Sequence, residues 1–186
     1  DICYISQDLF FVVISEIFIS NNDNIIKGKI INSKGENFLS IPPFRVNPND
    51  NAIDGKCTKI YGKNRVVVTY KDRSNEKIYF LIYELDFNNN LVALIKFKDY
   101  ANVMDDIKIT QAFLFSLKNG NFIISVNELY EESGYPDVKD FDIRYSIYDS
   151  NGNIQESKRT LNTNKYRNQE NPDFAELENG SVISTF

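Results

Sequence analysis

Four short apolar segments decide the fold of this chain: residues 9–15 (LFFVVIS), 65–70 (RVVVTY), 121–126 (NFIISV) and 181–186 (SVISTF). Their first residues lie 56, 56 and 60 positions apart, so the segments recur with a nearly constant period. Branched and aromatic side chains dominate each segment, and such side chains favour β-strands. A repeat of this length that supplies strands in every copy predicts a repeat architecture.

A turn signal precedes each of these apolar segments. Two signals are Asn-Gly pairs, at residues 119–120 and 179–180, and the other two lie at residues 7–8 and 63–64. Asn-Gly between apolar strands predicts a tight hairpin of type I′, because both residue types tolerate the positive φ that this turn needs. Each apolar segment is therefore expected to be the second strand of a hairpin.

Further strand-like stretches flank each hairpin. First strands are expected at residues 2–6, 56–61, 107–117 and 174–177, third strands at 24–32, 77–86 and 141–149, and fourth strands at 37–46, 91–98 and 154–161. Turn signals such as residues 149–153 (DSNGN) separate the third strand from the fourth. Each repeat is therefore predicted to be a four-stranded antiparallel meander.

The predicted strands change from apolar to polar within each repeat. The second strand is almost wholly apolar, whereas the fourth is polar, as in residues 155–160 (QESKRT). The fourth strand of the first repeat also contains Pro42 and Pro43, and proline in a strand favours an edge position. Buried inner strands with a solvated outer edge are typical of β-propeller blades. The predicted fold is therefore all-β, with about three and a half blades of a larger propeller.

The phase of the repeat predicts blades at about residues 1–50, 51–104 and 105–166, and a partial blade at 167–186. Propellers typically close with about four to eight blades. We therefore expect that the remainder of its own chain, or another copy, completes the ring. A β-trefoil and a β-sandwich are alternative folds, but neither accounts for repeated meanders with a polar outer edge.

Composition excludes two classes of partner. The net charge is −5 and the basic residues are scattered, which argues against a nucleic-acid partner. No apolar run has the length of a membrane helix, so membrane insertion is not expected. A hydrophobic content of 42% is enough for a folded core.

Residues 141–153 (FDIRYSIYDSNGN) and 171–183 (NPDFAELENGSVI) resemble the tandem propeller-type repeats of large secreted and cell-surface proteins. Those repeats read as a strand, D-x-x-G, then N-P-x-x-A-x-L-x-x-G and an apolar strand. The tryptophan that usually ends their inner strand is absent, and Phe186 or Tyr70 stands nearest. The resemblance covers the last third of the chain and implies a propeller with an extracellular or cell-surface location, but no reaction.

A second resemblance lies in composition. The Asn-rich chain is similar to giant repetitive surface proteins, including the scaffoldins of anaerobic gut fungi. That resemblance implies a scaffoldin-like or cohesin-type module of a multi-enzyme complex. A self-assembling structural protein, in which open strand edges pair between chains, is a related alternative.

The residues offer little for catalysis. The chain has no histidine, which removes the commonest general base and the usual zinc ligand. Paired carboxylates could still hydrolyse glycosides, but the acids fall mainly in expected loops, and the inner strands carry only Glu176. The acids in question are Asp105, Asp106, Glu131, Glu132, Asp137, Asp140 and Asp142. Residues 149–153 lack the glutamate that closes a calcium loop and are better explained as a turn. We therefore expect that the chain is not an enzyme and that it binds no cofactor and no metal.

The sequence favours a binding surface over an active site. The connection at residues 129–140 is long, and it combines tyrosines with acids. Tyrosine offers a large contact area at low entropic cost, as interfaces require. The candidate binding residues are Tyr130, Glu131, Glu132, Tyr135, Pro136 and Tyr166.

Two cysteines, Cys3 and Cys57, occupy equivalent predicted strands of consecutive repeats. They can be two small buried thiols or a disulfide between neighbouring repeats, and the sequence leaves both open.

The function expected from these observations is a non-catalytic extracellular or cell-surface repeat scaffold that binds a protein or glycan partner. The alternative is part of a propeller-based carbohydrate-active enzyme, which would need a convergent acidic pair.

Overall fold

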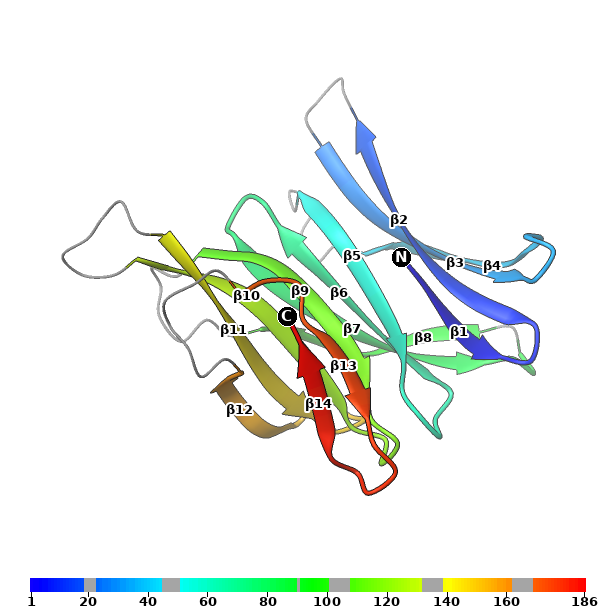
Figure 1. Ribbon diagram of the computed structural model, residues 1–186. Helices are drawn as coiled ribbons and strands as arrows, with labels where there is room; N and C mark the ends of the chain where they lie inside the picture. Colours follow the sequence, from blue (N-terminus) through cyan, green and yellow to red (C-terminus); the bar gives the residue numbers. More distant parts are fainter. Residues whose placement is uncertain (19–22, 45–50, 90, 101–107, 132–138, 162–168) are drawn as a thin grey trace.

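In the computed structural model the chain is all-β (Figure 1). The structure describes residues 1–18, 23–44, 51–89, 91–100, 108–131, 139–161 and 169–186. No helix within these ranges is long and apolar enough to cross a membrane.

The strands form four antiparallel sheets. Sheet 1 contains β1 (Ile2–Ser6), β2 (Leu9–Phe18), β3 (Asp23–Asn32) and β4 (Asn37–Phe44). Sheet 2 contains β5 (Ala52–Lys59), β6 (Arg65–Asp72), β7 (Lys77–Asp86) and β8 (Leu91–Asp99). Sheet 3 contains β9 (Lys108–Ser116), β10 (Phe122–Glu131), β11 (Lys139–Tyr148) and β12 (Ile154–Thr160). Sheet 4 contains β13 (Asp173–Glu176) and β14 (Val182–Thr185).

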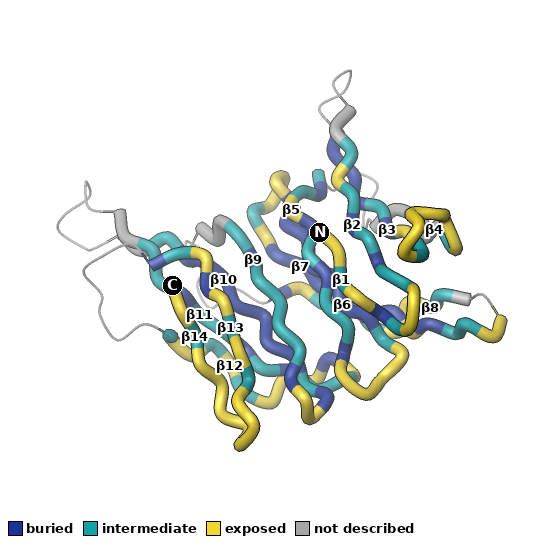
Figure 2. Tube along the Cα trace, turned by 45° about the vertical axis from the view of Figure 1, so that its right-hand side comes forward, coloured by how far each residue is buried: buried dark blue, intermediate teal, exposed yellow. Residues whose placement is uncertain are grey.

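Strand order follows chain order in every sheet, so the predicted meanders are confirmed. The first strands of the four sheets, β1, β5, β9 and β13, run side by side in Figures 1 and 2. Each sheet continues from this inner row to its last strand, and β4 and β12 are outer edges. The prolines Pro42 and Pro43 lie in edge strand β4, as their missing donors require. The arrangement is that of a partial propeller.

The core consists of two layers between the sheets. Sheet 1 packs against sheet 2 through residues such as Phe11, Val68 and Leu81, all at most 3% exposed. Sheet 2 packs against sheet 3 through an aromatic group in which Phe80 lies 4.9 Å from Tyr148, measured between ring centroids. Strand β6 serves both layers, so almost all its side chains are buried. This explains why the second strand of the second repeat lacks a polar face.

The strand turns differ from the predicted type I′. At residues 117–121 the N–H of Gly120 donates to the carbonyl of Leu117 over 3.0 Å, and the Leu117 N–H donates to the carbonyl of Asn121 over 2.8 Å. Positive φ in this turn is confined to Gly120, at 85°, and Asn119 instead accepts the Asn121 N–H through its side chain. This is a three-residue hairpin with a glycine bulge. The prediction was wrong because asparagine holds the turn through its side chain rather than its own backbone conformation.

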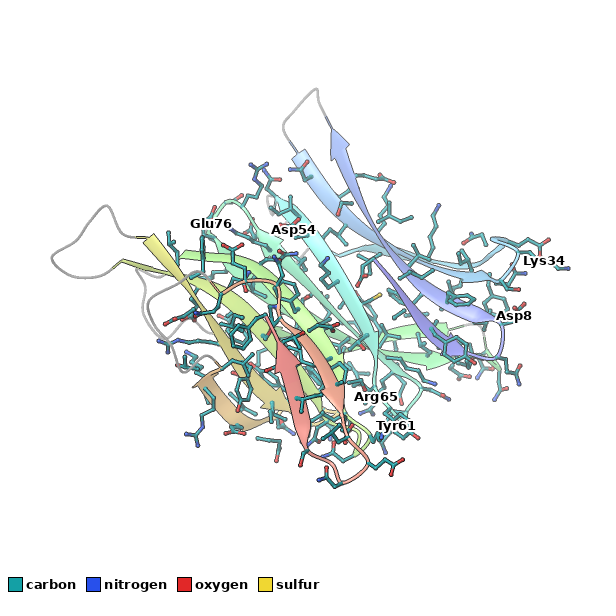
Figure 3. All side chains as sticks on the ribbon, in the orientation of Figure 1. Asp8, Lys34, Asp54, Tyr61, Arg65 and Glu76 are labelled. Atoms are coloured by element: carbon teal, nitrogen blue, oxygen red, sulfur yellow. The ribbon has the colours of Figure 1, made fainter. Side chains whose placement is uncertain are left out.

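The meander order gives each sheet two distinct ends. The hairpin end carries the first-to-second and third-to-fourth strand turns, and the connection end carries the remaining links. Figure 3 shows Tyr61 and Arg65 at the hairpin end of sheet 2, and Asp54 and Glu76 at its connection end.

Candidate active site

The predicted binding residues are only partly described. Strand β10 includes Tyr130 and Glu131, which pair with Asp140 and Lys139 of β11. The structure does not describe the side chains of these residues, and Glu132, Tyr135, Pro136 and Tyr166 lie outside the described residues. The binding patch therefore stays a prediction.

Buried polar side chains gather toward the connection end of the sheets. One group joins sheets 1 and 2. There Asn24 donates to the side chain of Asn51 over 2.5 Å, and the Asn51 N–H donates to Asp72 over 3.0 Å. Lys71 and Glu76 form an ion pair within sheet 2. Asp72 and Glu76 are thus engaged by neighbouring groups, which indicates a structural role for both acids.

The second group lies on sheet 3, on the face that packs against sheet 2. Along β10 the side chains of Phe122, Ile124 and Val126 point into the buried layer. Strand alternation places Glu128 next on that same face, and its exposed fraction is only 5%. A carboxyl group at a position where the pattern demands an apolar side chain is costly unless it has partners.

Glu128 has partners of both signs. Asp142 of β11 lies directly opposite Glu128 in the strand register, on the same face. Side chains so paired have Cβ atoms about 4.5–5.5 Å apart. Arg144 stands one position further along that face, and its Nε lies 2.8 Å from Oε2 of Glu128. Glu128 and Asp142 therefore form a pair of carboxyl groups beside a guanidinium.

An irregularity in β12 brings a second cation to the group. The pairing of β11 with β12 shifts between Tyr145 and Ile147, and Lys158 in this bulge has a φ of 50°. The Lys158 N–H donates to Oγ of Ser146 over 3.0 Å. Burial lowers the pKa of Lys158, while its interaction with Glu128 acts in the opposite direction.

Burial is the main influence on Glu128 and raises the pKa of its carboxyl group. Arg144 and Lys158 oppose this rise, and the charge of Asp142 adds to it. Glu128 therefore holds its proton at a higher pH than an ordinary glutamate.

Tyr100, which directly follows β8 of sheet 2, contacts this group from across the layer between sheets 2 and 3. It is 2% exposed, and its hydroxyl lies 3.4 Å from Oγ of Ser146. Burial raises the pKa of Tyr100 to about 12, with a smaller contribution from Glu128. The site therefore has a neutral hydroxyl beside Ser146.

Two other acids of the described chain, Glu176 and Asp149, are engaged in holding the fold. The expectation that the inner strands carry only Glu176 was wrong, because β5 also includes Asp54 and β13 also includes Asp173. Glu176 accepts the N–H of Lys118 over 2.6 Å and so joins sheet 4 to the hairpin turn of sheet 3. Asp149 accepts the N–H groups of Asn151 and Asn153 over 2.8 and 2.9 Å. Residues 149–153 are thus a hairpin turn, as preferred over a calcium loop. Among the described residues, no three Cys, Asp or Glu side chains gather as a metal site would require.

Two shallow cavities lie at the opposite, hairpin end. One of about 450 Å³ is lined by Asn64, Glu84 and Asp86, and its Glu84 pairs with Arg65 at 3.6 Å. The other, of about 380 Å³, lies along the inner strands between Cys3 and Ser116. The first cavity contains two carboxyl groups, but the pKa of Asp86 is lowered. Glu128 is a buried carboxyl group with a raised pKa opposite a second one, so we place the candidate site at Glu128.

Sequence reasoning missed Glu128 and grouped Asp142 with acids that fall mainly in loops. Asp142 lies inside strand β11. One available signal was the interruption of the apolar series Phe122, Ile124 and Val126 by a charge at Glu128. The opposite charge of Arg144, on the next predicted strand, was a second signal, because a buried acid needs such a partner.

No protein-family model and no curated protein matches the chain. Solved structures do match. An α-L-arabinanase of Penicillium chrysogenum, complexed with arabinobiose, superposes with a TM-score of 0.63 at 13% identity, over 95% of this chain and 53% of that one. An α-L-arabinofuranosidase of Fusarium graminearum, in complex with an iminosugar inhibitor, gives 0.62 at 14% identity with the same coverage. An endo-arabinase of Bacteroides thetaiotaomicron gives 0.52 at 11% identity, over 99% and 67%.

The chain spans about half the length of the first of these structures. The similarity supports the propeller fold predicted from the repeat. It also corrects the functional expectation, because the matching propellers are glycosidases rather than scaffolds. The expectations of a non-catalytic scaffold and of no enzyme are therefore wrong, and the findings favour the carbohydrate-active alternative.

Proposed function

We propose that this chain is part of a propeller glycoside hydrolase, with Glu128 and Asp142 as its pair of acids. The observation that carries the proposal is their direct opposition on β10 and β11, with one carboxyl group buried and its pKa raised. Two carboxyl groups in unlike environments are what glycoside hydrolysis uses.

The environments assign the roles. Glu128 is the general acid, because burial favours its protonated form. Its Oε2 faces Arg144, so the proton is carried on Oε1 and passes to the oxygen of the scissile bond. Asp142 is half-buried and is the second carboxyl group of the pair, either the base for water or the nucleophile.

The cations position the acid. Arg144 orients Glu128 through the 2.8 Å contact, and Lys158 adds a second positive charge. Both limit the rise of the Glu128 pKa, so the carboxyl group can lose its proton and recover it within one cycle.

The substrate class proposed is an oligosaccharide that contains arabinose, because the matching arabinanase holds arabinobiose. Strand β10 continues from Glu128 to Tyr130 and Glu131, so these two residues of the predicted patch lie near Glu128 along the same strand. We assign that patch, including Glu132, Tyr135, Pro136 and Tyr166, to glycan binding. An extracellular or cell-surface location would give access to such a polymer.

The test is hydrolysis of arabino-oligosaccharides and of 4-nitrophenyl α-L-arabinofuranoside by the chain and by Glu128→Gln. Loss of a general acid costs about 10²–10⁴-fold in rate. Glu156→Gln is a matched control, because Glu156 also contacts an arginine Nε at 2.8 Å in sheet 3 but is far more exposed. Its rate should stay within about twofold of the parent's, as for surface changes.

Equal rates for Glu128→Gln and the parent would refute the role of Glu128. Binding of arabinobiose without hydrolysis by the parent chain would refute the enzyme and leave a glycan-binding module.

A further inference from the structure

Cys3 and Cys57 lie on the first strands of neighbouring sheets. Cys3 is in β1 and Cys57 is in β5, and these two strands contact each other. Both residues are free thiols in the structure and belong to the layer between sheets 1 and 2.

The backbone brings the thiols together. Cys3 pairs with Phe11 of β2 in the strand register, and the Sγ of Cys57 lies 3.7 Å from the carbonyl oxygen of Phe11. The N–H of Cys57 donates to the Asp1 carboxylate over 2.9 Å, which fixes β5 beside the start of β1. Cys57 therefore contacts Phe11, the residue that lies directly opposite Cys3 in the pairing of β1 with β2.

The thiols are also in mutual contact. A hydrogen bond with Cys3 is the main reason that the pKa of Cys57 is raised, and burial adds to it. Sulfur atoms in hydrogen-bond contact need only small side-chain rotations to reach bonding distance, provided that the strands are already adjacent.

Access differs between the two residues. Cys57 is 6% exposed, whereas Cys3 is half-buried and lines the cavity of about 380 Å³ with Tyr4, Thr58 and Ser116. A small disulfide reagent can therefore reach Cys3 but not Cys57.

We propose that Cys3 and Cys57 form a disulfide that joins sheets 1 and 2 when the chain meets a disulfide donor in an oxidising compartment. The Cys3 thiolate attacks the donor and releases one donor thiol. Cys57 then loses its proton, attacks the Sγ of Cys3 and releases the second donor thiol. Two protein thiols are oxidised and one donor disulfide is reduced. This proposal is independent of the proposed hydrolase.

The bond would stabilise the inner row of strands. It closes a loop from Cys3 to Cys57 that includes β2, β3 and β4 of sheet 1, and such a cross-link restricts the conformations open to the unfolded chain. We expect the oxidised chain to melt about 5–15 °C above the reduced chain.

The test uses the reduced chain incubated with oxidised glutathione, alkylated in denaturant and digested without reductant. The expected product is a cross-linked pair of peptides that contain Cys3 and Cys57, together with the higher melting temperature. Alkylation of both cysteines, or a Cys3–Cys3 link between two chains, would overturn the proposal.

Two variants check the order of the steps. Cys57→Ser should stop with glutathione attached to Cys3, whereas Cys3→Ser should leave the buried Cys57 unmodified. Glutathione on Cys57 in the folded Cys3→Ser chain would contradict the order. If either variant fails to fold, the peptide map of the parent chain still decides whether the bond forms.

Discussion

The Nε of Arg144 lies 2.8 Å from the Oε2 of Glu128, across the neighbouring strands β11 and β10 of sheet 3. The arginine favours the charged carboxylate, whereas burial favours the neutral acid, and burial is the larger influence. The balance between them sets the pH range in which Glu128 can donate a proton.

Removing the arginine should shift this range. In Arg144→Gln the pKa of Glu128 is expected to rise further, because the positive charge that opposes the rise is lost. The alkaline limb of the kcat profile should then move to higher pH. The measurement is kcat against pH for the parent and the variant. A limb that moves to lower pH would contradict the assignment of Glu128 as the acid.

Stability should also depend on the protonation of Glu128. Its pKa in the folded chain is raised above the usual 4.5, so the folded state binds this proton more tightly than the unfolded state does. The free energy of unfolding should therefore fall as pH rises from the usual pKa through the raised one. Urea unfolding across that range should show a smaller fall for Glu128→Gln.

Asp149 provides an internal comparison for that measurement. Burial acts to raise its pKa, but hydrogen bonds with Asn153 and Asn151 outweigh burial and lower it. Its contribution is present above the unfolded pKa and is lost as pH falls through the lowered one. Glu128 and Asp149 therefore act on stability in separate pH windows. If the free energy of unfolding of Glu128→Gln falls with pH as steeply as that of the parent, the burial of the Glu128 carboxyl group would be contradicted.

Much of the fold could be predicted from local patterns. Strand β7 begins and ends at the predicted residues, Lys77 and Asp86, because turn signals lie at both ends. Strand β5 begins at Ala52, four residues earlier than predicted. The register of β5 shifts between Ile53 and Lys56, and Asp54 has a φ of 54°. Such a bulge interrupts the alternation of buried and exposed side chains by which a strand is recognised in the sequence.

The site could not be predicted in the same way. Arg144, Ser146 and Tyr148 alternate with apolar residues in β11 and suggest one solvated face. In the structure Ser146 and Tyr148 are at most 3% exposed, because both faces of the sheet are covered. Contacts between repeats decide which face of sheet 3 packs against sheet 2. The alternation of residues within one strand does not specify these contacts.

The aromatic group between sheets 2 and 3 should be a major source of stability. The ring of Tyr148 lies 5.4 Å from Phe122, stacked at 16°, and 4.9 Å from Phe80. Tyr148→Ala is expected to lower the free energy of unfolding by about 3–5 kcal/mol, because it removes a buried ring and leaves a cavity. Urea unfolding measures this loss.

Tyr61→Ala is the matched control, because Tyr61 is 59% exposed. Its effect should stay within about 0.5 kcal/mol. Equal losses in the two variants would mean that the layer between sheets 2 and 3 does not form as described.

Gly55 is required where β5 crosses sheet 1. A Cβ at this position would lie 2.4 Å from Cγ1 of Val13 and 3.0 Å from Cδ1 of Ile26. The valine side chain is short and branched, so it cannot rotate away without strain. Gly55→Ala should therefore destabilise the chain by about 1–3 kcal/mol, as overpacking does.

The double variant Gly55→Ala/Val13→Ala tests the cause. Val13→Ala alone removes buried methyl groups and should itself destabilise the chain, since Val13 is 4% exposed. In the double variant the new methyl group occupies the space that the valine vacates. The combined loss should therefore be smaller than the sum of the single losses by about 0.5–3 kcal/mol, the coupling typical of residues in contact. Urea unfolding of the four chains gives this coupling directly. Additive losses would contradict the close approach of β5 to Val13 as the reason that Gly55 is needed.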